Sequence, residues 1–409
     1  MDFFEVQFAL DTFYAVMAGA LVMWMAAGFT MLEAGMVRAK NASEIVTKNL
    51  GLYSIACIMY LICGFYLMYS PDSLGGLLPQ IGSHWSLAVP EDTAAAMQYG
   101  NYAEQADFFF QVVFVATAMS IVSGAVAGRM KMLPFFLFAV VLTGFIYPIQ
   151  GYWNWGEGFL NQNGYSDYAG SGTVHLCGAA AALAVVTVLG ARNGKYNSDG
   201  SANLIPGSNI PMAALGVWIL WLGWFGFNGG SELKVSTGGS AIAVAQVFMN
   251  TNLAATGGVV ATLLTSLIKT GKMDITMAMN GAIAGLVAIT AGPSAPSGGE
   301  AVIIGAVGGV IVYFSILFFE RTLKVDDPVG AISAHGTVGI YGVMVVPLTS
   351  DATFGAQLLG VVLIAGFTYV MSLLTIYVIN LFMPIRASDT EQEVGLDLTE
   401  TGVEAYPDF

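Results

Sequence analysis

Eleven stretches of apolar residues, separated by short polar segments, follow one another along the 409-residue chain. A helix needs about 20 apolar residues to cross the hydrocarbon core of a bilayer, and these stretches approach or exceed that length. They predict an all-α, polytopic membrane protein with eleven transmembrane helices, at approximately residues 9–32, 47–69, 107–127, 133–151, 171–190, 210–228, 239–267, 276–292, 301–319, 332–349 and 354–383.

The basic residues between these segments predict the orientation of the chain. Cytoplasmic loops of membrane proteins are enriched in Lys and Arg. The loops alternate between a set rich in basic residues and a set that includes the N-terminus. Of the 13 basic residues, only Lys234 falls in the second set. Eleven helices with the N-terminus outside and the C-terminus inside fit this alternation. The remaining basic residues lie in alternate loops or the tail: Arg38, Lys40, Lys48, Arg129, Lys131, Arg192, Lys195, Lys269, Lys272, Arg321, Lys324 and Arg386.

Composition supports a membrane protein and excludes both a soluble globular protein and a nucleic-acid-binding protein. Hydrophobic residues make up 56% of the chain and charged residues 10%, against about 25% charged in soluble domains. The net charge of −14 provides no basic surface for nucleic acid. Cys57, Cys63 and Cys177 lie in apolar stretches, which indicates buried thiols and neither a disulfide framework nor a metal cluster.

Two matched motifs indicate an internal repeat. Asp167 precedes His175 by eight residues, and Asp327 precedes His335 by eight, each His in a stretch rich in small residues. The first motif belongs to a span expected to enter from outside and the second to one expected to enter from inside. Such opposed halves are typical of transporters. We therefore expect two inverted five-helix repeats, at approximately 1–190 and 210–350, followed by an extra helix at 354–383.

His175 and His335 are the best candidates for chemistry, because ionisable side chains at membrane depth usually mark pathways or proton relays. The structural alternative is that each ring is satisfied by a hydrogen bond to a neighbouring helix. A metal site is a weaker alternative, since two His without further ligands at suitable spacing make an incomplete set. The chain also has no hydrolase, metalloprotease or P-loop motif, so we expect neither an enzyme nor a cofactor.

The acidic and aromatic residues near the spans leave alternatives open. Asp327 is expected to cap a helix, because a carboxylate at a helix N-terminus binds free backbone N–H groups. For Asp167 capping and a contribution to cation attraction are equally supported. Phe114, Trp155 and the aromatic segment 224–231 are individually more typical of packing or interfacial anchoring than of ligand binding.

The sequence resembles the ammonium transporter family (Amt/Mep/Rh), on its Amt branch, over nearly its whole length. The likeness rests on FTMLEAGMVR at 29–38 followed by Lys40 and Asn41, DYAG at 167–170 leading to His175, GWFGFNGGS at 223–231, and DDP at 326–328 leading to His335 and Gly336. The resemblance implies a homotrimer whose protomers, spanning 1–385, each contain a pore.

The resemblance also implies roles for individual residues. Trp155, Phe114 and Ser231 would form an outer recruitment site for ammonium, with Asp167 beside it. Phe114 and Phe227 would form an aromatic gate, and His175 and His335 a twin-His pair in the pore. The implied function is ammonium transport across the cytoplasmic membrane, in which ammonium is deprotonated, ammonia is conducted, and the His pair passes the proton separately.

The C-terminal segment 386–409 resembles the cytoplasmic tail through which Amt proteins are regulated, which implies a PII-type signalling protein as a partner in a prokaryote. Composition alone predicts an acidic, mobile end. Thr401 stands where some relatives have His.

Two other functions stay open. In an ammonium sensor, the same fold would signal through its tail or through an output domain beyond Phe409; no kinase or cyclase motif follows the spans here, which favours transport. In a gas channel closer to the Rh branch, the aromatic recruitment residues would not be expected.

Overall fold

A computed structural model describes residues 3–71 and 74–407. Within these ranges the elements are helices, without a β-strand. The α-helices are α1 Phe3–Met36, α2 Ala42–Met59, α3 Phe65–Met68, α4 Thr93–Met97, α5 Glu104–Val126, α6 Met132–Val141, α7 Tyr147–Asn154, α8 Phe159–Gln162, α9 Cys177–Leu189, α10 Ile210–Gly230, α11 Gly238–Thr270, α12 Ile275–Thr290, α13 Gly298–Leu317, α14 Val338–Val345, α15 Phe354–Phe382 and α16 Asp389–Val394.

Short segments of tighter or wider helix interrupt or extend the α-helices. The π-helical segments are η2 Tyr60–Gly64, η3 Leu142–Ile146, η4 Ser171–Leu176, η5 Phe318–Thr322, η6 Ile332–Thr337 and η8 Asp397–Thr401; the 3₁₀ segments are η1 Ala39–Asn41 and η7 Val346–Leu348. Such π-helical insertions occur frequently at functional sites. Two of them, η4 and η6, carry the candidate residues His175 and His335.

Nine helices in the described ranges are long and apolar enough to cross a membrane, and two apolar helices, Ile275–Thr290 and Ile332–Leu348, are shorter. These segments coincide with the eleven predicted from the sequence, usually to within a few residues. The largest differences are the first helix, which begins at Phe3, the second, which begins at Ala39, and the fourth, which extends with interruptions to Gln162. The chain is therefore an all-helical, multi-pass membrane protein.

Capping residues explain where several of these helices begin. Ser297 and Glu300 form a reciprocal capping box at α13, and Thr237 and Ser240 form another at α11. Asp274 accepts hydrogen bonds from two backbone N–H groups at the start of α12. These side chains bind the N–H groups that have no partner within the first turn of a helix.

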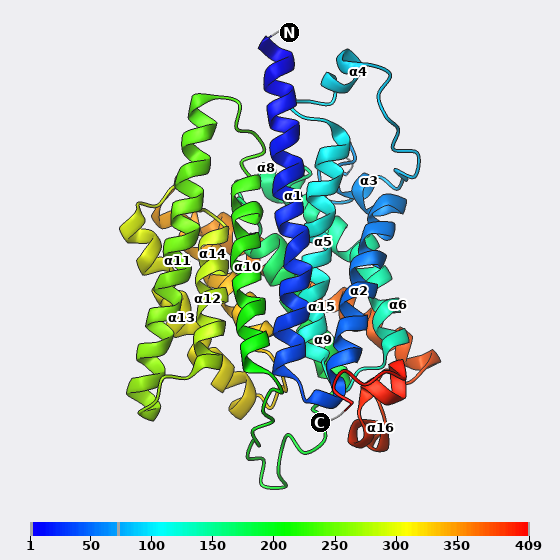
Figure 1. The fold of residues 1–409 in the computed structure, drawn as a ribbon. Coiled ribbons are helices and arrows are strands. Elements are labelled where there is room, and N and C mark those ends of the chain that lie inside the picture. The colour runs from blue at the N-terminus through cyan, green and yellow to red at the C-terminus, as the bar shows by residue number, and fades with distance from the viewer. Residues whose placement is uncertain (1–2, 72–73, 408–409) are drawn as a thin grey trace.

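The long helices run side by side between two ends of the molecule, with the N-terminus at one end and the C-terminus at the other (Figure 1). We call these the N-terminal face and the C-terminal face. α1 packs along α10 and α5, whereas α11, α12 and α13 form a second group. Gly216 of α10 lies against α1, where a Cβ would stand 2.3 Å from the Leu32 backbone nitrogen. Close packing of this kind is typical of helices in membranes.

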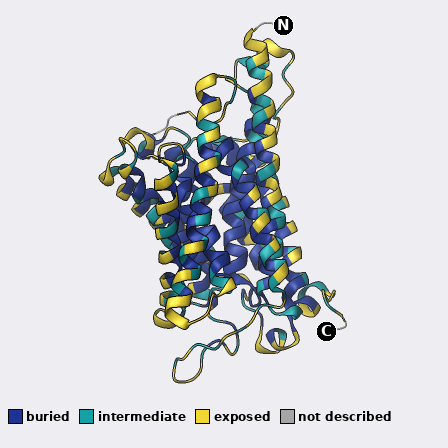
Figure 2. Ribbon diagram, turned by 60° about the vertical axis from the view of Figure 1, so that its left-hand side comes forward, coloured by how far each residue is buried: buried dark blue, intermediate teal, exposed yellow. Residues whose placement is uncertain are grey.

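Burial distinguishes central helices from peripheral ones. In the most apolar 18-residue stretch of α5, 94% of the residues are buried, against 33% in that of α15. Figure 2 shows the same gradient, with buried residues inside and exposed residues along the outer faces of the bundle. Because both helices are apolar, the exposed faces of the peripheral helices are suited to lipid, and α5 forms part of the protein interior.

The C-terminal segment is folded against the C-terminal face, contrary to the mobile end expected from its composition. The Asp397 carboxylate accepts a hydrogen bond from the Glu44 backbone N–H at 2.8 Å, and the Asn41 side-chain oxygen accepts one from the Leu396 N–H at 3.0 Å. Lys131 and Glu391 form an ion pair at 2.8 Å. This pair lowers the pKa of Glu391 to about 2, so the carboxylate remains charged at neutral pH.

An arginine cluster lies beneath the bundle at the same face. The Arg192 guanidinium donates from Nε and Nη2 to the two oxygens of Asp326, each at 2.8 Å, and both side chains are buried. Arg129 donates to backbone oxygens of Asp326, Ala125 and Gly190. Burial lowers the pKa of Arg129 to about 10, which still leaves it charged at neutral pH. The cluster joins the loops that follow α5, α9 and α13.

Candidate functional site: an aromatic pocket above a buried histidine pair

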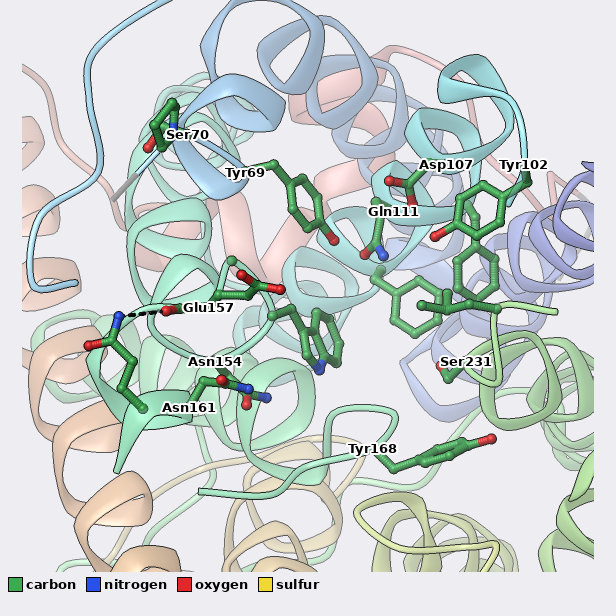
Figure 3. A pocket seen from close by; sticks show the side chains of 17 residues that line it. Tyr69, Ser70, Tyr102, Asp107, Gln111, Asn154, Glu157, Asn161, Tyr168 and Ser231 are labelled. Carbon is green, nitrogen blue, oxygen red and sulfur yellow. Dashed lines mark hydrogen bonds between the residues drawn. The ribbon is translucent and has the colours of Figure 1, made fainter. Parts of the chain in front are cut away.

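A cavity of about 710 Å³ opens near the N-terminal face and contains three of the candidate residues, Phe114, Trp155 and Ser231. Figure 3 shows its lining, in which polar and aromatic side chains surround one space. The other lining residues are Tyr69, Ser70, Pro71, Tyr102, Asp107, Phe110, Gln111, Asn154, Gly156, Glu157, Asn161, Gln162, Tyr168 and Leu233.

The floor of this pocket is aromatic. The Phe114 ring of α5 meets the Trp155 ring edge to face, with centroids 5.9 Å apart and planes at 88°. The Trp155 indole N–H donates to the Asp167 backbone oxygen at 2.9 Å, which fixes the orientation of the ring. Ser231, just past α10, donates its hydroxyl to the Phe227 carbonyl at 2.8 Å, so its oxygen lone pairs remain available as acceptors. Aromatic faces and a hydroxyl acceptor are suited to a small cation that carries N–H groups.

Phe227 stacks against Phe114 on the side toward the histidines. Their ring centroids are 4.1 Å apart, and each side chain is buried. Phe227 stacks in turn on the His175 ring, at 5.2 Å and 22°. The two phenylalanines therefore separate the pocket from the histidine pair.

The two histidines meet in the interior although 160 residues separate them. Their Nδ1 atoms lie 3.2 Å apart, so one ring donates this hydrogen bond and the other accepts it. Trp224 stacks on His175 at 5.0 Å, and Phe29 lies 6.3 Å from His335. Among the described residues, His175 Nε2 is buried without a hydrogen-bond partner. A buried nitrogen in this state is free to bind a small polar molecule.

Local backbone geometry places both rings in the same way. Gly170 and Gly330 adopt positive φ angles of 108° and 79°, a conformation that side chains with a Cβ rarely adopt. Each glycine precedes a π-helical segment, and a His follows five residues after the glycine. The two motifs thus share a local backbone geometry as well as a sequence spacing.

Asp167 and Asp327 cap these segments with matching hydrogen bonds. Asp167 accepts from the backbone N–H groups of Gly170 at 3.1 Å and of Gly172 at 3.0 Å; Asp327 accepts from Gly330 at 3.1 Å and Ile332 at 2.7 Å. Both carboxylates therefore cap the start of a helical segment. Asp167 is absent from the lining of the aromatic pocket, and its backbone oxygen instead holds Trp155. Its effect on a bound cation would act through that ring and through its charge.

Sequence reasoning missed several residues of the pocket. Asp107 and Glu157 bring carboxylates to the lining, and Tyr69, Tyr102 and Tyr168 bring phenol groups. Their signal in the sequence is weak because tyrosines and acids near span ends are typical of membrane interfaces in general. Trp224 was part of a recognised motif, but its contact with His175 requires the tertiary structure.

Comparison with known proteins decides the family. The model of the Ammonium Transporter Family matches residues 13–406. The chain belongs to the ammonium transporter family. It is 36% identical to ammonium transporter Amt2 of Archaeoglobus fulgidus, over 98% of this chain and 89% of that protein. It is 31% identical to the ammonium transporter of Bacillus subtilis, over 97% and 98%.

Solved structures of the family have the same fold. A structure titled Sensor Amt Protein superposes with a TM-score of 0.89 at 33% identity, covering 97% of this chain and 99% of that one. Candida albicans Mep2 superposes with a TM-score of 0.83 at 25% identity, covering 96% and 89%. The resemblance found in the sequence is therefore confirmed, and the chain is a multi-pass membrane protein of the ammonium transporter family.

Proposed function

We propose that this protein carries ammonium across the cytoplasmic membrane, recruiting the ion in the aromatic pocket and conducting ammonia past His175 and His335. The observation that carries the proposal is the continuous order of Trp155, Phe114, Phe227, His175 and His335 from the pocket to the interior. Family membership supports the substrate.

Recruitment relies on charge and hydrogen-bond direction. A desolvated cation over an aromatic face gains about 2 kcal/mol. The Ser231 oxygen accepts an N–H bond, and K⁺ has no donor to offer it. Asp107 and Glu157 contribute negative charge around the entrance. Together these groups favour ammonium over a metal cation of similar size.

We expect ammonium to lose its proton because the interior beyond Phe227 is largely apolar. Burying an unpaired ion in an apolar medium costs tens of kcal/mol in an idealised estimate, so past Phe227 the proton leaves the ammonium ion. Ammonia then moves along the imidazole edges, where His175 Nε2 is free to bind it. The Nδ1–Nδ1 hydrogen bond gives the proton a separate route, because each neutral ring both donates and accepts.

The arrangement in the membrane is part of the proposal. All eleven apolar helices span it, the N-terminal face is outside, and segments 1–190 and 210–350 are inverted repeats. The alternation of basic loops supports this orientation. The resemblance supports a homotrimer, a regulatory tail at 386–409, and a PII-type protein as its partner.

An ammonium sensor is the second candidate function, and the structural likeness to a protein titled Sensor Amt Protein favours it. Its pocket and histidine pair would then bind ammonium and change the docking of the tail. The relatives named ammonium transporters favour transport.

Current across a proteoliposome membrane after an ammonium concentration jump tests the proposal, with His175→Asp and empty liposomes measured beside the wild type. A saturating transient with the wild type and altered ion selectivity or charge coupling in the variant are expected. Absence of current from folded protein that still binds ammonium would favour the sensor. An unchanged current and selectivity in the variant would refute the role of His175.

A further inference from the structure

Glu33 is a buried carboxylate that the recruitment site and histidine pair leave without a function. It lies in the last turn of α1 and is 1% exposed. Phe29, one helical turn earlier, faces His335. Residues four apart lie on the same side of a helix, so α1 presents Glu33 on this side but nearer the C-terminal face.

A small internal cavity joins Glu33 to His335. Its volume is about 10 Å³, close to the least that holds one water molecule. Both side chains line it, together with Asn280 of α12. The remaining lining residues are Phe29, Leu32, Ser120, Ile121, Gly124, Ile283, Val329, Ala331 and Ala334. Most of this lining is apolar, so its polar groups are concentrated at these three residues and Ser120.

Asn280 supplies an independent sign of a ligand. Its side chain is 7% exposed, and its amide nitrogen donates to the Thr276 backbone oxygen at 3.1 Å. Within the described residues, its Oδ1 atom is buried without a hydrogen-bond donor. A buried unpaired acceptor carries a free-energy cost of about 1–3 kcal/mol, which a ligand with N–H groups would remove.

Hydrogen bonds hold the Glu33 carboxylate in place but do not fill all of its acceptor positions. Its Oε1 accepts from the Ser123 hydroxyl at 2.6 Å, and its Oε2 from the Asn49 amide at 3.0 Å. A carboxylate has about four acceptor positions, so two remain. Lys48, the basic side chain whose charge acts on Glu33, pairs with Glu44 and donates to the Met130 carbonyl. The positive charge of Lys48 is thus engaged elsewhere.

Building on the proposed transport function, we propose that Glu33 and Asn280 form a second ammonium site, on the C-terminal side of the histidine pair. The proton that ammonium releases past Phe227 passes through His175 and His335 to the Glu33 carboxylate. Ammonia arriving in the cavity takes this proton, which gives an ammonium ion and restores the carboxylate. Asn280 Oδ1 accepts one N–H of that ion. One ammonium ion and one positive charge cross in each cycle.

Two substitutions of Glu33 separate this role from a structural one. Glu33→Gln keeps the length of the side chain and an acceptor but loses the exchangeable acid, whereas Glu33→Asp keeps the acid and shortens the side chain. If Glu33 serves the proton, the ammonium-evoked current per folded protein follows the order wild type, E33D, E33Q. Loss of a positioned proton donor predicts a decrease of about 10²-fold for E33Q. A bracing role predicts the opposite order of the two variants.

Glu44→Gln is the matched control, because Glu44 is an equally buried acid that does not line the cavity. Its current per folded protein is expected to match the wild type. Asn280→Ala is the additional variant and should weaken the current without any change of charge. A current in E33Q equal to the wild type, or higher than in E33D, would overturn the inference; so would an unchanged N280A current if the Glu33 variants did not fold.

The same measurements distinguish this inference from the proposed function. If the wild type shows neither ammonium-evoked current nor uptake of labelled methylammonium, the transport function fails, and the second site fails with it. If the wild type transports and the Glu33 and Asn280 variants do so equally well, only the second site is refuted.

Discussion

Replacing Arg192 with Ala should destabilise the protein strongly through the arginine cluster at the C-terminal face. The change removes two charge-assisted hydrogen bonds to Asp326, both 2.8 Å long, and leaves only the Arg192 backbone N–H at 2.8 Å as a donor from this residue. The Asp326 side chain is 1% exposed and cannot turn to solvent. Removing one partner of a buried ion pair costs about 3–5 kcal/mol.

The magnitude is tested by denaturant unfolding of the detergent-solubilised protein, compared among the wild type, R192A, Asp326→Ala and the double variant. Because the double variant has no unpaired carboxylate, it should be more stable than R192A, with a coupling energy of about 1–3 kcal/mol. A loss below about 1 kcal/mol in R192A, or a double variant no more stable than R192A, would refute the reasoning.

The same ion pair predicts how the stability of the protein changes with pH. Burial by itself raises the pKa of Asp326, but the hydrogen bonds from Arg192 and the charges of Arg129 and Arg192 outweigh it and hold the pKa below the ordinary value of 3.8. A lowered native pKa means that the stabilisation is complete above the unfolded value and disappears as pH falls through the native one. The stability difference between the wild type and R192A should therefore be constant near neutral pH and shrink only in strong acid.

Three further predictions concern the pocket, the gate and the tail. Trp155→Leu should weaken the apparent affinity for ammonium about thirtyfold, the equivalent of about 2 kcal/mol, in concentration–current curves; an unchanged half-saturation would contradict recruitment by the ring. Phe227→Ala should alter ammonium flux and admit competing cations, measured as current in K⁺ alone, and an unaltered flux would reject the gate. Glu391→Gln should loosen the tail from Lys131, seen as faster proteolysis after residue 386, whereas equal cleavage rates would show that the ion pair does not hold it.

Much of the fold could be predicted from the sequence because the relevant signals are local. The length of each apolar stretch reflects the thickness of a bilayer, so the spans end within a few residues of the helices observed, as for 354–383 and Phe354–Phe382. One departure is at the start of α1, which begins at Phe3 although its apolar stretch is predicted from residue 9. Asp11, inside that stretch, is accommodated because it accepts from the Val235 and Ser236 backbone N–H groups.

The conformation of the tail could not be predicted from its composition. An acidic segment is expected to be mobile when it has no partners. Here Asp397 and Leu396 bond to the helix start at Asn41 and Glu44, more than 350 residues away in sequence. Docking depends on backbone donors and side chains gathered by the fold, and composition carries no record of them.

The sequence by itself determined that the chain spans a membrane, that two matched motifs each place a His within a span, and that the motifs are those of ammonium transporters. Only the tertiary structure decided that His175 and His335 meet at 3.2 Å, that Phe227 stands between them and the pocket, and that Asp167 caps a helix. The physical reason is range. Span length depends on the residues of one apolar stretch, whereas contacts such as that of His175 with His335 form where helices distant in sequence pack together, and that packing is set by shape.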